Sequence, residues 1–418
     1  MAKTVLIVGA GFAGLNAAKT LGKKGRDLSV VVIDRRNYHL FQPLLYQVAM
    51  AALSPADIAY PIRSLLSEYP NIRVLLGDVQ SIHAKEKEIR GDFGALKFDY
   101  LLVATGAQHS YFGHDEWEDN APGLKTLEQA TEIRRRVLTA FELAERETDP
   151  EKQKAFLTFV IVGGGPTGVE IAGALGEISR YTLEKDFRNI DPRLTRVVLV
   201  EAGQRILSSF SPESSERALR DLEKLGVSVR TGTRVTNVNK DGVAMGSEFL
   251  RASTVIWAAG VLPSALNKTF GTELDKAGRV KVNPDLSLPG FPEIYVVGDQ
   301  AAVQVNGATL PGLAPVAMQE GRHAARNIVR LAGGKKTEPF HFVDKGTMAT
   351  IGRSRAIVEF GKLHFFGFLA WLTWLFVHIY YLIGFKNRLF VLFQWTYSYL
   401  TFGRGARLIV HKNWKMEK

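Results

Sequence analysis

Two stretches of the chain repeat one order of hydrophobic and polar positions. Residues 4–8 are an unbroken apolar run rich in β-branched side chains, residues 12–24 carry alanine and leucine and stop at Gly25, and residues 28–33 are a second apolar run. Continuous apolar runs of this length are typical of strands buried on both faces of a parallel sheet. The pattern therefore predicts a strand, a helix and a strand, which make one βαβ unit.

The second copy begins about 154 residues later. It predicts a strand at 159–162, a helix at 169–178 and a strand at 197–200, with an insertion near 181–195. Between the two copies, residues 126–147 have the pattern of a charged amphipathic helix. We expect its run of three arginines, Arg134 to Arg136, to lie on the solvated face of that helix.

Each predicted unit carries a glycine motif at the turn from strand to helix. The first is Gly9-x-Gly11-x-x-Gly14 with Asp34 after the second strand, and the second is Gly163-x-Gly165-x-x-Gly168 with Glu201 in the equivalent place. The glycines permit a tight turn, close approach to a pyrophosphate and helix packing, while the acid binds ribose hydroxyls. Two dinucleotide sites on one chain indicate electron transfer between two nucleotides. A carboxylate at Glu201 repels a 2′-phosphate, which favours NADH over NADPH, although Arg205 lies close by.

Three further segments have the pattern of strands that end in small residues. They are residues 99–106, 255–260 and 294–299, and the last ends in Gly298-Asp299. A carboxylate at the carboxyl end of a parallel strand can reach the polyol of a ligand. Each segment alone is an ordinary strand end, but their order beside two glycine motifs is specific.

Composition excludes several kinds of chemistry. The 418 residues contain no cysteine, so disulfides, iron–sulfur clusters, thiolate zinc sites and cysteine relays are impossible, and we expect no metal site. The net charge is +11, but residues 361–418 hold eight Lys/Arg against one Asp/Glu. Because this basic tail is also aromatic, it favours an anionic membrane surface over nucleic acid. The N-terminal apolar run is expected to be a strand and not a signal peptide.

The tail contains two uncharged segments, residues 363–385 and 389–403. Nine of the 23 residues in the first are aromatic, and the 15 residues of the second are too few to cross a bilayer. One crossing would also place Lys386, Arg388, Arg404, Arg407 and Lys412 outside, against the positive-inside rule. We therefore expect two interfacial helices, with a dimer interface as a compatible alternative. His364 and His378, 14 residues apart, are expected near one helical face and are no haem pair.

The motifs resemble those of flavoproteins with two dinucleotide-binding domains, the glutathione-reductase-like class. Within this class, the chain is similar to type II NADH:quinone oxidoreductases. The similarity lies in residues 41–49, 163–170 and 314–321, in the aromatic tail and in the absence of cysteine. The resemblance implies the following FAD-binding residues: Gly9, Gly11, Phe12, Ala13, Gly14, Asp34, Arg35, Ala104, Thr105, Gly106, Gly298, Asp299 and Ala317. It implies the following NADH-binding residues: Gly163, Gly165, Pro166, Thr167, Gly168, Glu201, Ala259 and Gly260.

The resemblance also implies three residues for catalysis. Gln319 matches a family glutamine beside the flavin ring and quinone, but Pro315 replaces the first glutamine of that family segment. Glu170 matches a glutamate that couples protonation to reduction, and a first-turn helix acid is the alternative. Lys386 resembles a lysine at the quinone entrance, with an interfacial anchor as the alternative.

These observations predict an α/β fold with two Rossmann-like domains and C-terminal membrane-docking helices. We expect an FAD domain (residues 1–118 and 262–340), an NADH domain (119–261) and a membrane-anchoring region (341–418). The expected activity is electron transfer from NADH through FAD to a membrane quinone without proton pumping, at the cytoplasmic face of the membrane and as a homodimer. The alternatives are a soluble ferredoxin or rubredoxin reductase and a non-catalytic redox sensor that binds FAD and NADH.

Overall fold

The computed structural model describes residues 2–184, 186–305, 307–401, 403 and 405–410. The chain divides into two compact units. The first unit comprises residues 1–40, 59–108 and 261–343, and the second unit comprises residues 41–58, 109–260 and 344–418. The three-part division expected from the sequence remains a prediction.

The first unit is built around a six-stranded sheet in the order β20-β21-β9-β1-β2-β5. Its strands are β1 (Thr4–Val8), β2 (Ser29–Asp34), β5 (Ile72–Leu76), β9 (Tyr100–Val103), β20 (Ser287–Leu288) and β21 (Phe291–Val296). The neighbours pair in parallel except β20 and β21. The chain leaves β1 towards β2 and later returns to β9 on the other side of β1. The carboxyl end of β1 is therefore the point where strand order reverses and where ligands bind in such sheets.

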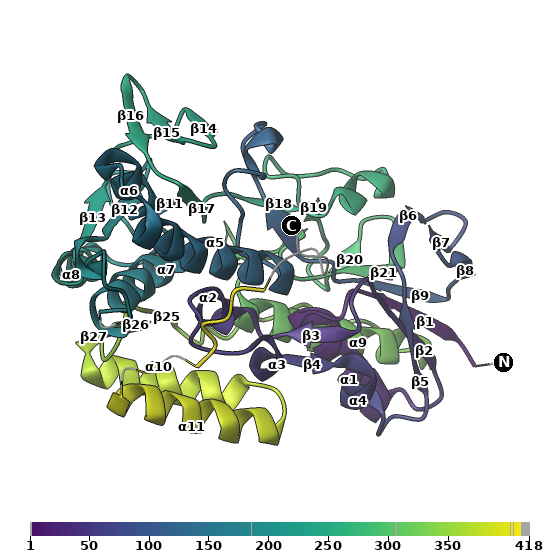
Figure 1. The fold of residues 1–418 in the computed structure, drawn as a ribbon. Helices are drawn as coiled ribbons and strands as arrows, with labels where there is room; N and C mark the ends of the chain where they lie inside the picture. The colour runs from purple at the N-terminus through teal and green to yellow at the C-terminus, as the bar shows by residue number, and fades with distance from the viewer. Residues whose placement is uncertain (1, 185, 306, 402, 404, 411–418) are drawn as a thin grey trace. The chain divides into compact units, whose positions relative to one another are not determined.

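Two long helices of the first unit, α1 (Phe12–Lys24) and α9 (Ala314–Ala332), lie side by side (Figure 1). A Cβ on Gly321 would lie 2.1 Å from the carbonyl oxygen of Ala13, so this contact requires glycine. The smaller elements are β3 (Tyr38–Leu40), β4 (Ala59–Pro61), α4 (Ile62–Leu66), β6 (Val79–His83), β7 (Glu88–Gly91), β8 (Gly94–Lys97), β18 (Val261–Pro263), β19 (Val280–Lys281), β22 (Ala301–Ala302), β23 (Gln304–Val305) and β24 (Ala308–Thr309). A further strand, β10 (Ala107–His109), pairs with β18.

The second unit repeats the same design on a parallel sheet in the order β13-β12-β11-β17. Its strands are β11 (Thr158–Val162), β12 (Arg196–Val200), β13 (Val227–Arg230) and β17 (Thr254–Trp257), and its helices are α2 (Leu45–Ala49), α3 (Pro55–Ile58), α5 (Leu127–Arg146), α6 (Pro150–Phe156), α7 (Pro166–Glu177) and α8 (Pro212–Lys224). A small antiparallel sheet joins β14 (Asn237–Asn239), β15 (Gly242–Met245) and β16 (Glu248–Arg251). Both predicted βαβ units are confirmed.

The predicted helix at 126–147 is confirmed, but the expectation for its arginines is wrong. Thr126 caps the helix by accepting a hydrogen bond from the backbone N–H of Gln129. Arg134 is only 8% exposed, and Arg135 and Arg136 pair with Glu132 on the same helix. The run therefore has one buried member, because backbone carbonyls of distant segments surround Arg134.

The C-terminal part of the second unit begins with an antiparallel sheet and ends with two helices. The sheet joins β25 (Thr347–Thr350), β26 (Ala356–Phe360) and β27 (Leu363–Gly367), and the helices are α10 (Phe368–Tyr381) and α11 (Phe385–Thr401). His364 lies on β27 and His378 on α10, so the expectation that they share a helical face is wrong. The cause is Gly367, whose φ of +77° ends the strand directly before the helix.

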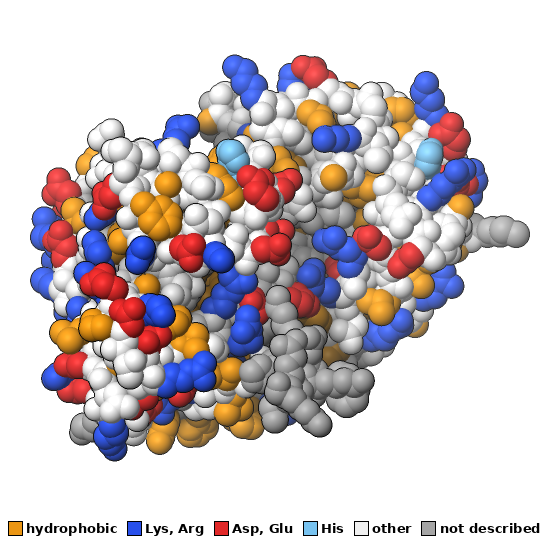
Figure 2. Space-filling view, turned by 45° about the horizontal axis from the view of Figure 1, so that its top comes forward, with side chains coloured by type: hydrophobic (Ala, Val, Ile, Leu, Met, Phe, Trp, Pro, Cys, Tyr) orange, Lys and Arg blue, Asp and Glu red, His pale blue; other side chains and the backbone are white. Residues whose placement is uncertain are grey.

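The helices α10 and α11 carry many exposed aromatic and aliphatic side chains. Phe376, Tyr380, Phe385, Phe393 and Leu400 are all at least 67% exposed. Figure 2 shows acidic and basic side chains interspersed over the face that it displays, with hydrophobic side chains gathered along its lower edge. Within the described part of the chain, no helix combines the length and the apolar character needed to cross a bilayer. Arg404 and Lys412, which entered the charge argument, lie outside the described residues.

Candidate active site

The first glycine turn follows β1 and has no room for side chains at two of its positions. Gly9 has a φ of +95°, and a Cβ there would lie 2.4 Å from the carbonyl oxygen of Ala104. A Cβ on Gly14 would lie 1.8 Å from the carbonyl oxygen of Gly9. At Gly11, in contrast, a Cβ would meet no described atom within 4 Å. The turn is therefore closed on the protein side and open where a pyrophosphate would approach.

Asp34 ends β2 and is bonded to the same turn. Its Oδ2 accepts the backbone N–H of Ala10 at 2.6 Å, and its Oδ1 accepts that of Arg36 at 2.8 Å. Burial raises the pKa of the Asp34 carboxyl, and these backbone donors oppose the shift. Each oxygen keeps a lone pair for a ribose hydroxyl. The neighbouring Arg35 is exposed and lies 3.8 Å from Asp78.

A histidine that sequence analysis did not single out also faces this turn. The His39 Nδ1 lies 2.9 Å from the carbonyl oxygen of Ala10, so Nδ1 must carry the proton. Burial lowers the pKa of His39 to about 4, which keeps the ring neutral and leaves Nε2 as an acceptor. That Nε2 is buried and has no hydrogen-bond partner among the described residues. A buried acceptor without a donor is costly, so it fits a ligand donor such as a hydroxyl.

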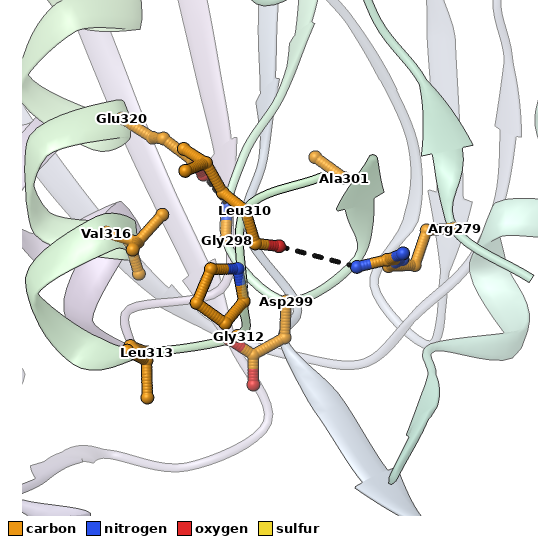
Figure 3. Close-up of a pocket in the computed structure, with 11 residues that line it drawn as sticks. Arg279, Gly298, Asp299, Ala301, Leu310, Gly312, Leu313, Val316 and Glu320 are labelled. Carbon is orange, nitrogen blue, oxygen red and sulfur yellow. Dashed lines mark hydrogen bonds between the residues drawn. The ribbon is translucent and has the colours of Figure 1, made fainter. Parts of the chain in front are cut away.

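The Gly298-Asp299 motif lies at the carboxyl end of β21 and lines a pocket with the first turns of α9 (Figure 3). Glu320 of α9 closes one side, since its Oε2 accepts the backbone N–H of Gly298 at 2.6 Å. Burial raises the pKa of Glu320 to about 8. Ala317 lines the same pocket, and Gly312 packs against the Asp299 side chain. Glu320 is a further residue of this site that the sequence motifs did not indicate.

The segment after β9 reaches the same region of the first unit. The backbone of Ala104 packs closely against Gly9, and Gly106 turns the backbone with a φ of +67°. The hydroxyl of Thr105 donates to the side-chain oxygen of Gln300, the residue after Asp299. The structure thus brings the first turn, Ala104 to Gly106 and Gly298-Asp299 together at one end of the sheet.

The second glycine turn repeats the first in the second unit. Gly163 has a φ of +109°, a Cβ on Gly168 would lie 1.8 Å from the carbonyl oxygen of Gly163, and Gly165 is open like Gly11. Pro166 and Thr167 begin α7, and Ala259 lies against Gly163. Gly260, with a φ of +70°, follows at the end of β17. Both copies therefore keep the close contacts and the opening that a dinucleotide needs.

Glu201 stands at the end of β12 as Asp34 stands at the end of β2. Its Oε2 accepts the N–H of Gly164 at 2.6 Å, and its Oε1 accepts the N–H of Gly203 at 2.6 Å. Arg205 donates to the carbonyl oxygens of Phe210 at 2.7 Å and Ser208 at 2.9 Å. Its guanidinium is thus bonded to its own loop. A carboxylate at this position favours ribose hydroxyls over a 2′-phosphate.

The helices at these motifs have N-termini without a side-chain cap, as do α2, α4 and α10. The N-cap residues of α1, α7 and α9 are Gly11, Gly165 and Leu313, and none of them caps its helix with a side chain. In contrast, α5, α6 and α8 are capped by Thr126, Asp149 and Ser211. Uncapped N-termini leave backbone N–H groups and the positive end of the helix dipole for an anionic ligand. The residues present fit a dinucleotide at each turn.

Glu170 lies in the first turns of α7, beyond the second glycine turn. Burial raises the pKa of its carboxyl to about 8, although a backbone hydrogen bond from Thr350 of β25 acts in the opposite direction. At neutral pH the folded protein therefore holds Glu170 mainly as the neutral acid. Such a group can donate a proton where an ordinary glutamate cannot.

Gln319 and Lys386 lie in different surroundings. The Gln319 amide donates to the carbonyl oxygens of Pro315 and Val343 and accepts the N–H of Val343 at 3.0 Å. Pro315 lies in the first turn of α9, where a missing N–H costs little. Lys386 is exposed near the start of α11, with its ammonium 5.7 Å from the centre of the Phe390 ring.

An aromatic pocket lies within the second unit, among α2, α7, β25, α10 and α11. The side chains of Trp371, Trp374 and Trp395 line it together with Gln47 and Thr350. The Gln47 Oε1 accepts the indole N–H of Trp395 at 2.7 Å. The indole N–H of Trp374, a residue 3% exposed, has no partner among the described residues. The pocket thus combines flat apolar walls with a buried hydrogen-bond donor.

Comparisons with known proteins match nearly the whole chain. Residues 3–321 match the family model described as pyridine nucleotide-disulphide oxidoreductase, and residues 345–405 match the NDH2 C-terminal domain. The chain is 43% identical to the type II NADH:quinone oxidoreductase Ndh of Mycobacterium tuberculosis, over 97% of this chain and 90% of that protein. It is 31% identical to a type II NADH:quinone oxidoreductase of Staphylococcus aureus, over 86% of this chain and 90% of that protein.

Solved structures share the fold. NDH2 from Plasmodium falciparum in complex with NADH superposes with a TM-score of 0.89 at 19% identity, covering 98% of this chain and 100% of that chain. A sulfide:quinone oxidoreductase from Aquifex aeolicus gives a TM-score of 0.76 at 20% identity, covering 93% of this chain and 92% of that chain. The α/β fold class expected from the sequence is confirmed.

Proposed function

The chain belongs to the type II NADH:quinone oxidoreductases, and from that premise we propose which of its residues carry each part of the reaction. The protein is a membrane-associated flavoenzyme that passes electrons from NADH through FAD to a quinone without pumping protons. The family assignment favours this activity over a ferredoxin reductase or a non-catalytic sensor. When bound, FAD would supply the redox chemistry between nicotinamide and quinone, and the residues named below would hold it.

We propose that the first unit binds FAD at the first glycine turn. The open position at Gly11 and the uncapped start of α1 receive the pyrophosphate, Asp34 binds the adenosine ribose, and Asp299 binds the ribityl chain. His39 adds an acceptor beside the turn. The rest of the FAD set implied by the resemblance is proposed on the same grounds.

We propose that NADH binds at the second glycine turn with Glu201 on its ribose. Two backbone N–H groups fix the Glu201 carboxylate, and Arg205 is bonded to its own loop carbonyls. A 2′-phosphate would meet a fixed negative charge there, which supports specificity for NADH. Ala259 and Gly260 complete the proposed set.

Quinone reduction also consumes two protons, and we propose Glu170 as a donor of one of them. Its raised pKa keeps a proton on the carboxyl at neutral pH, and Thr350 links this carboxyl to the wall of the aromatic pocket. We propose that this pocket admits the quinone ring, because indole rings provide flat contact and the Trp374 N–H can donate to a ring carbonyl. Gln319 and Lys386 are proposed as the flavin-side and entrance residues of the acceptor path.

The orientation, assembly and division of the chain are proposals of the same kind. The exposed aromatic side chains of α10 and α11, together with the +7 charge of residues 361–418, support docking on an anionic membrane face, which we take to be the cytoplasmic one. We propose a homodimer and the three-part division given by the sequence. Light scattering in detergent would test the dimer, and a mass of one chain per particle would refute it.

The observation that carries the function is the pair of open glycine turns, each with its own fixed acid. The test is an absorbance spectrum of the purified protein before and after NADH under nitrogen, followed by a soluble quinone. We expect a yellow chromophore that NADH bleaches and quinone restores. A colourless protein after reconstitution with FAD, or bleached protein that quinone does not restore, would refute the proposal.

A further inference from the structure

Arg134 of α5 is a buried arginine whose observed hydrogen bonds all go to backbone carbonyls. Its Nε donates to the carbonyl oxygen of Val48 at 2.7 Å, and its two terminal nitrogens donate to those of Leu53 at 2.8 Å and Ala406 at 3.3 Å. The side chain lies within the second unit and is 8% exposed. Asp57 is the nearby acid that favours its charge. A guanidinium fork is suited to holding several acceptors in one fixed arrangement.

Two of these carbonyls belong to the segment that ends α2. Val48 is in the last turn of α2, and Leu53 follows a bend at Ala51, which adopts a φ of +56° without being glycine. A left-handed alanine is strained and persists only where its surroundings hold it. Carbonyls at a helix end also need donors, and Arg134 gives Val48 one in addition to the backbone N–H of Ala51. Arg134 therefore fixes the bend that follows α2.

The same segment and the α3 turn that follows it are also bonded to α11. Gln47 of α2 accepts the indole N–H of Trp395, and the side chain of Asn387 donates to the carbonyl oxygen of Ala56 at 3.2 Å. Gln47 also donates to the hydroxyl of Tyr46 at 2.9 Å. Tyr46, Gln47 and Ala52 line the aromatic pocket. The segment is thus one wall of that pocket, held by Arg134 from α5 and by Trp395 of α11.

We propose that Arg134 is a positioning residue for quinone reduction, which sets the Tyr46–Gln47 wall of the aromatic pocket through its bonds to Val48 and Leu53. This inference rests on the proposed use of that pocket by the quinone. Arg134 itself touches neither substrate nor cofactor in this proposal. Its loss should weaken use of the quinone while leaving electron transfer from NADH to the flavin intact.

The experiment compares full-length R134M and R134K with the neighbouring variants R135M and R135K. Arg135 pairs with Glu132 on the same helix, and Arg136 remains to pair with Glu132 when Arg135 is replaced. Each protein is assayed with NADH and either ferricyanide, which takes electrons from the flavin, or a short-chain soluble quinone. FAD content and tryptophan emission are recorded for each.

For R134M we expect the KM for quinone to rise about tenfold, with ferricyanide turnover and FAD content within twofold of the wild type. R134K should give a smaller rise, since its ammonium can still donate to some of the three carbonyls but not to all of them. In both Arg134 variants, tryptophan emission should shift to longer wavelength as Trp395 loses Gln47. Both Arg135 variants should match the wild type.

An unchanged quinone KM in R134M, or a rise equal to that of R135M, would overturn the inference. If R134M is not recovered with FAD, the comparison of R134K with R135K tests the inference instead. Equal quinone KM values for these two variants would overturn the inference. Wild-type protein that reduces ferricyanide but no quinone would refute the proposed function instead.

Discussion

Replacing Glu170 with glutamine should stabilise the protein in a pH-dependent way. The pKa of this carboxyl is raised from 4.5 to about 8 by burial. Below pH 4.5 both the folded and the unfolded chain hold the proton, so the group has no effect on stability. As pH rises from 4.5 to 8, only the unfolded chain ionises, and stability falls by about 1.4 kcal/mol per pH unit. Above pH 8 the loss is constant.

The magnitude at pH 7 follows from this interval. Two and a half pH units above the ordinary pKa correspond to roughly 3 kcal/mol, and partial exposure of the Glu170 residue reduces this to about 2 kcal/mol. Glutamine is always neutral and its oxygen can still accept the Thr350 N–H. E170Q should therefore exceed the wild type by about 2 kcal/mol at pH 7, by more at pH 9 and by almost nothing at pH 4.5.

Urea unfolding at three pH values, followed by tryptophan fluorescence, measures this difference. E216Q is the control, because Glu216 has an exposed side chain on α8. In the same preparations, wild-type quinone turnover should fall as pH rises above about 8, where the neutral acid is lost, and E170Q should lack that decline. A stability difference that is the same at pH 4.5 and pH 9 would refute the reasoning.

Four further substitutions have expected outcomes. G14A and G168A each place a Cβ 1.8 Å from a carbonyl oxygen. G14A should therefore lose FAD, whereas G168A should keep FAD and lose NADH binding. FAD absorbance and NADH titration measure the two effects, and the reverse pattern would refute the assignment of the two turns. E201S should lower the ratio of kcat/KM for NADH over NADPH at least tenfold, and an unchanged ratio would remove Glu201 from the ribose site. E320A leaves the Gly298 N–H without its partner and should weaken FAD binding about tenfold. Flavin fluorescence on dilution measures the affinity, and a wild-type value in E320A would count against the role of Glu320.

The repeated part of the fold could be predicted because local patterns determine it. The run at 4–8 and the helix at 12–24 agree with β1 and α1, since buried parallel strands are apolar throughout and glycines mark the turns. Asp34 and Glu201 could be found by their spacing from these glycines. His39 could not, because it belongs to no spaced motif. Glu320 lies inside the 314–321 segment but is not one of its matched residues, and both side chains are defined by a backbone group of another segment.

The errors arose where distant segments decide the surroundings of a residue. Charged runs on helices are usually solvated, but the carbonyls around Arg134 come from residues 81, 86 and 272 positions away. In the tail, counting uncharged residues merged β27 with α10. Gly361 and Gly367, with φ of +58° and +77°, bound that strand and were the available signal.

The small sheet of β25, β26 and β27 connects the buried Glu170 carboxyl with α10, a helix that carries exposed apolar side chains. Its first strand carries Thr350, which bonds the Glu170 carboxyl, and its last strand continues through Gly367 directly into α10. Three hydrogen-bonded strands therefore connect α10, which we expect to contact lipid, to the ionisable Glu170. Vesicles of different composition should shift the pH at which turnover declines, which makes the bilayer a modulator of proton supply as well as a place of attachment.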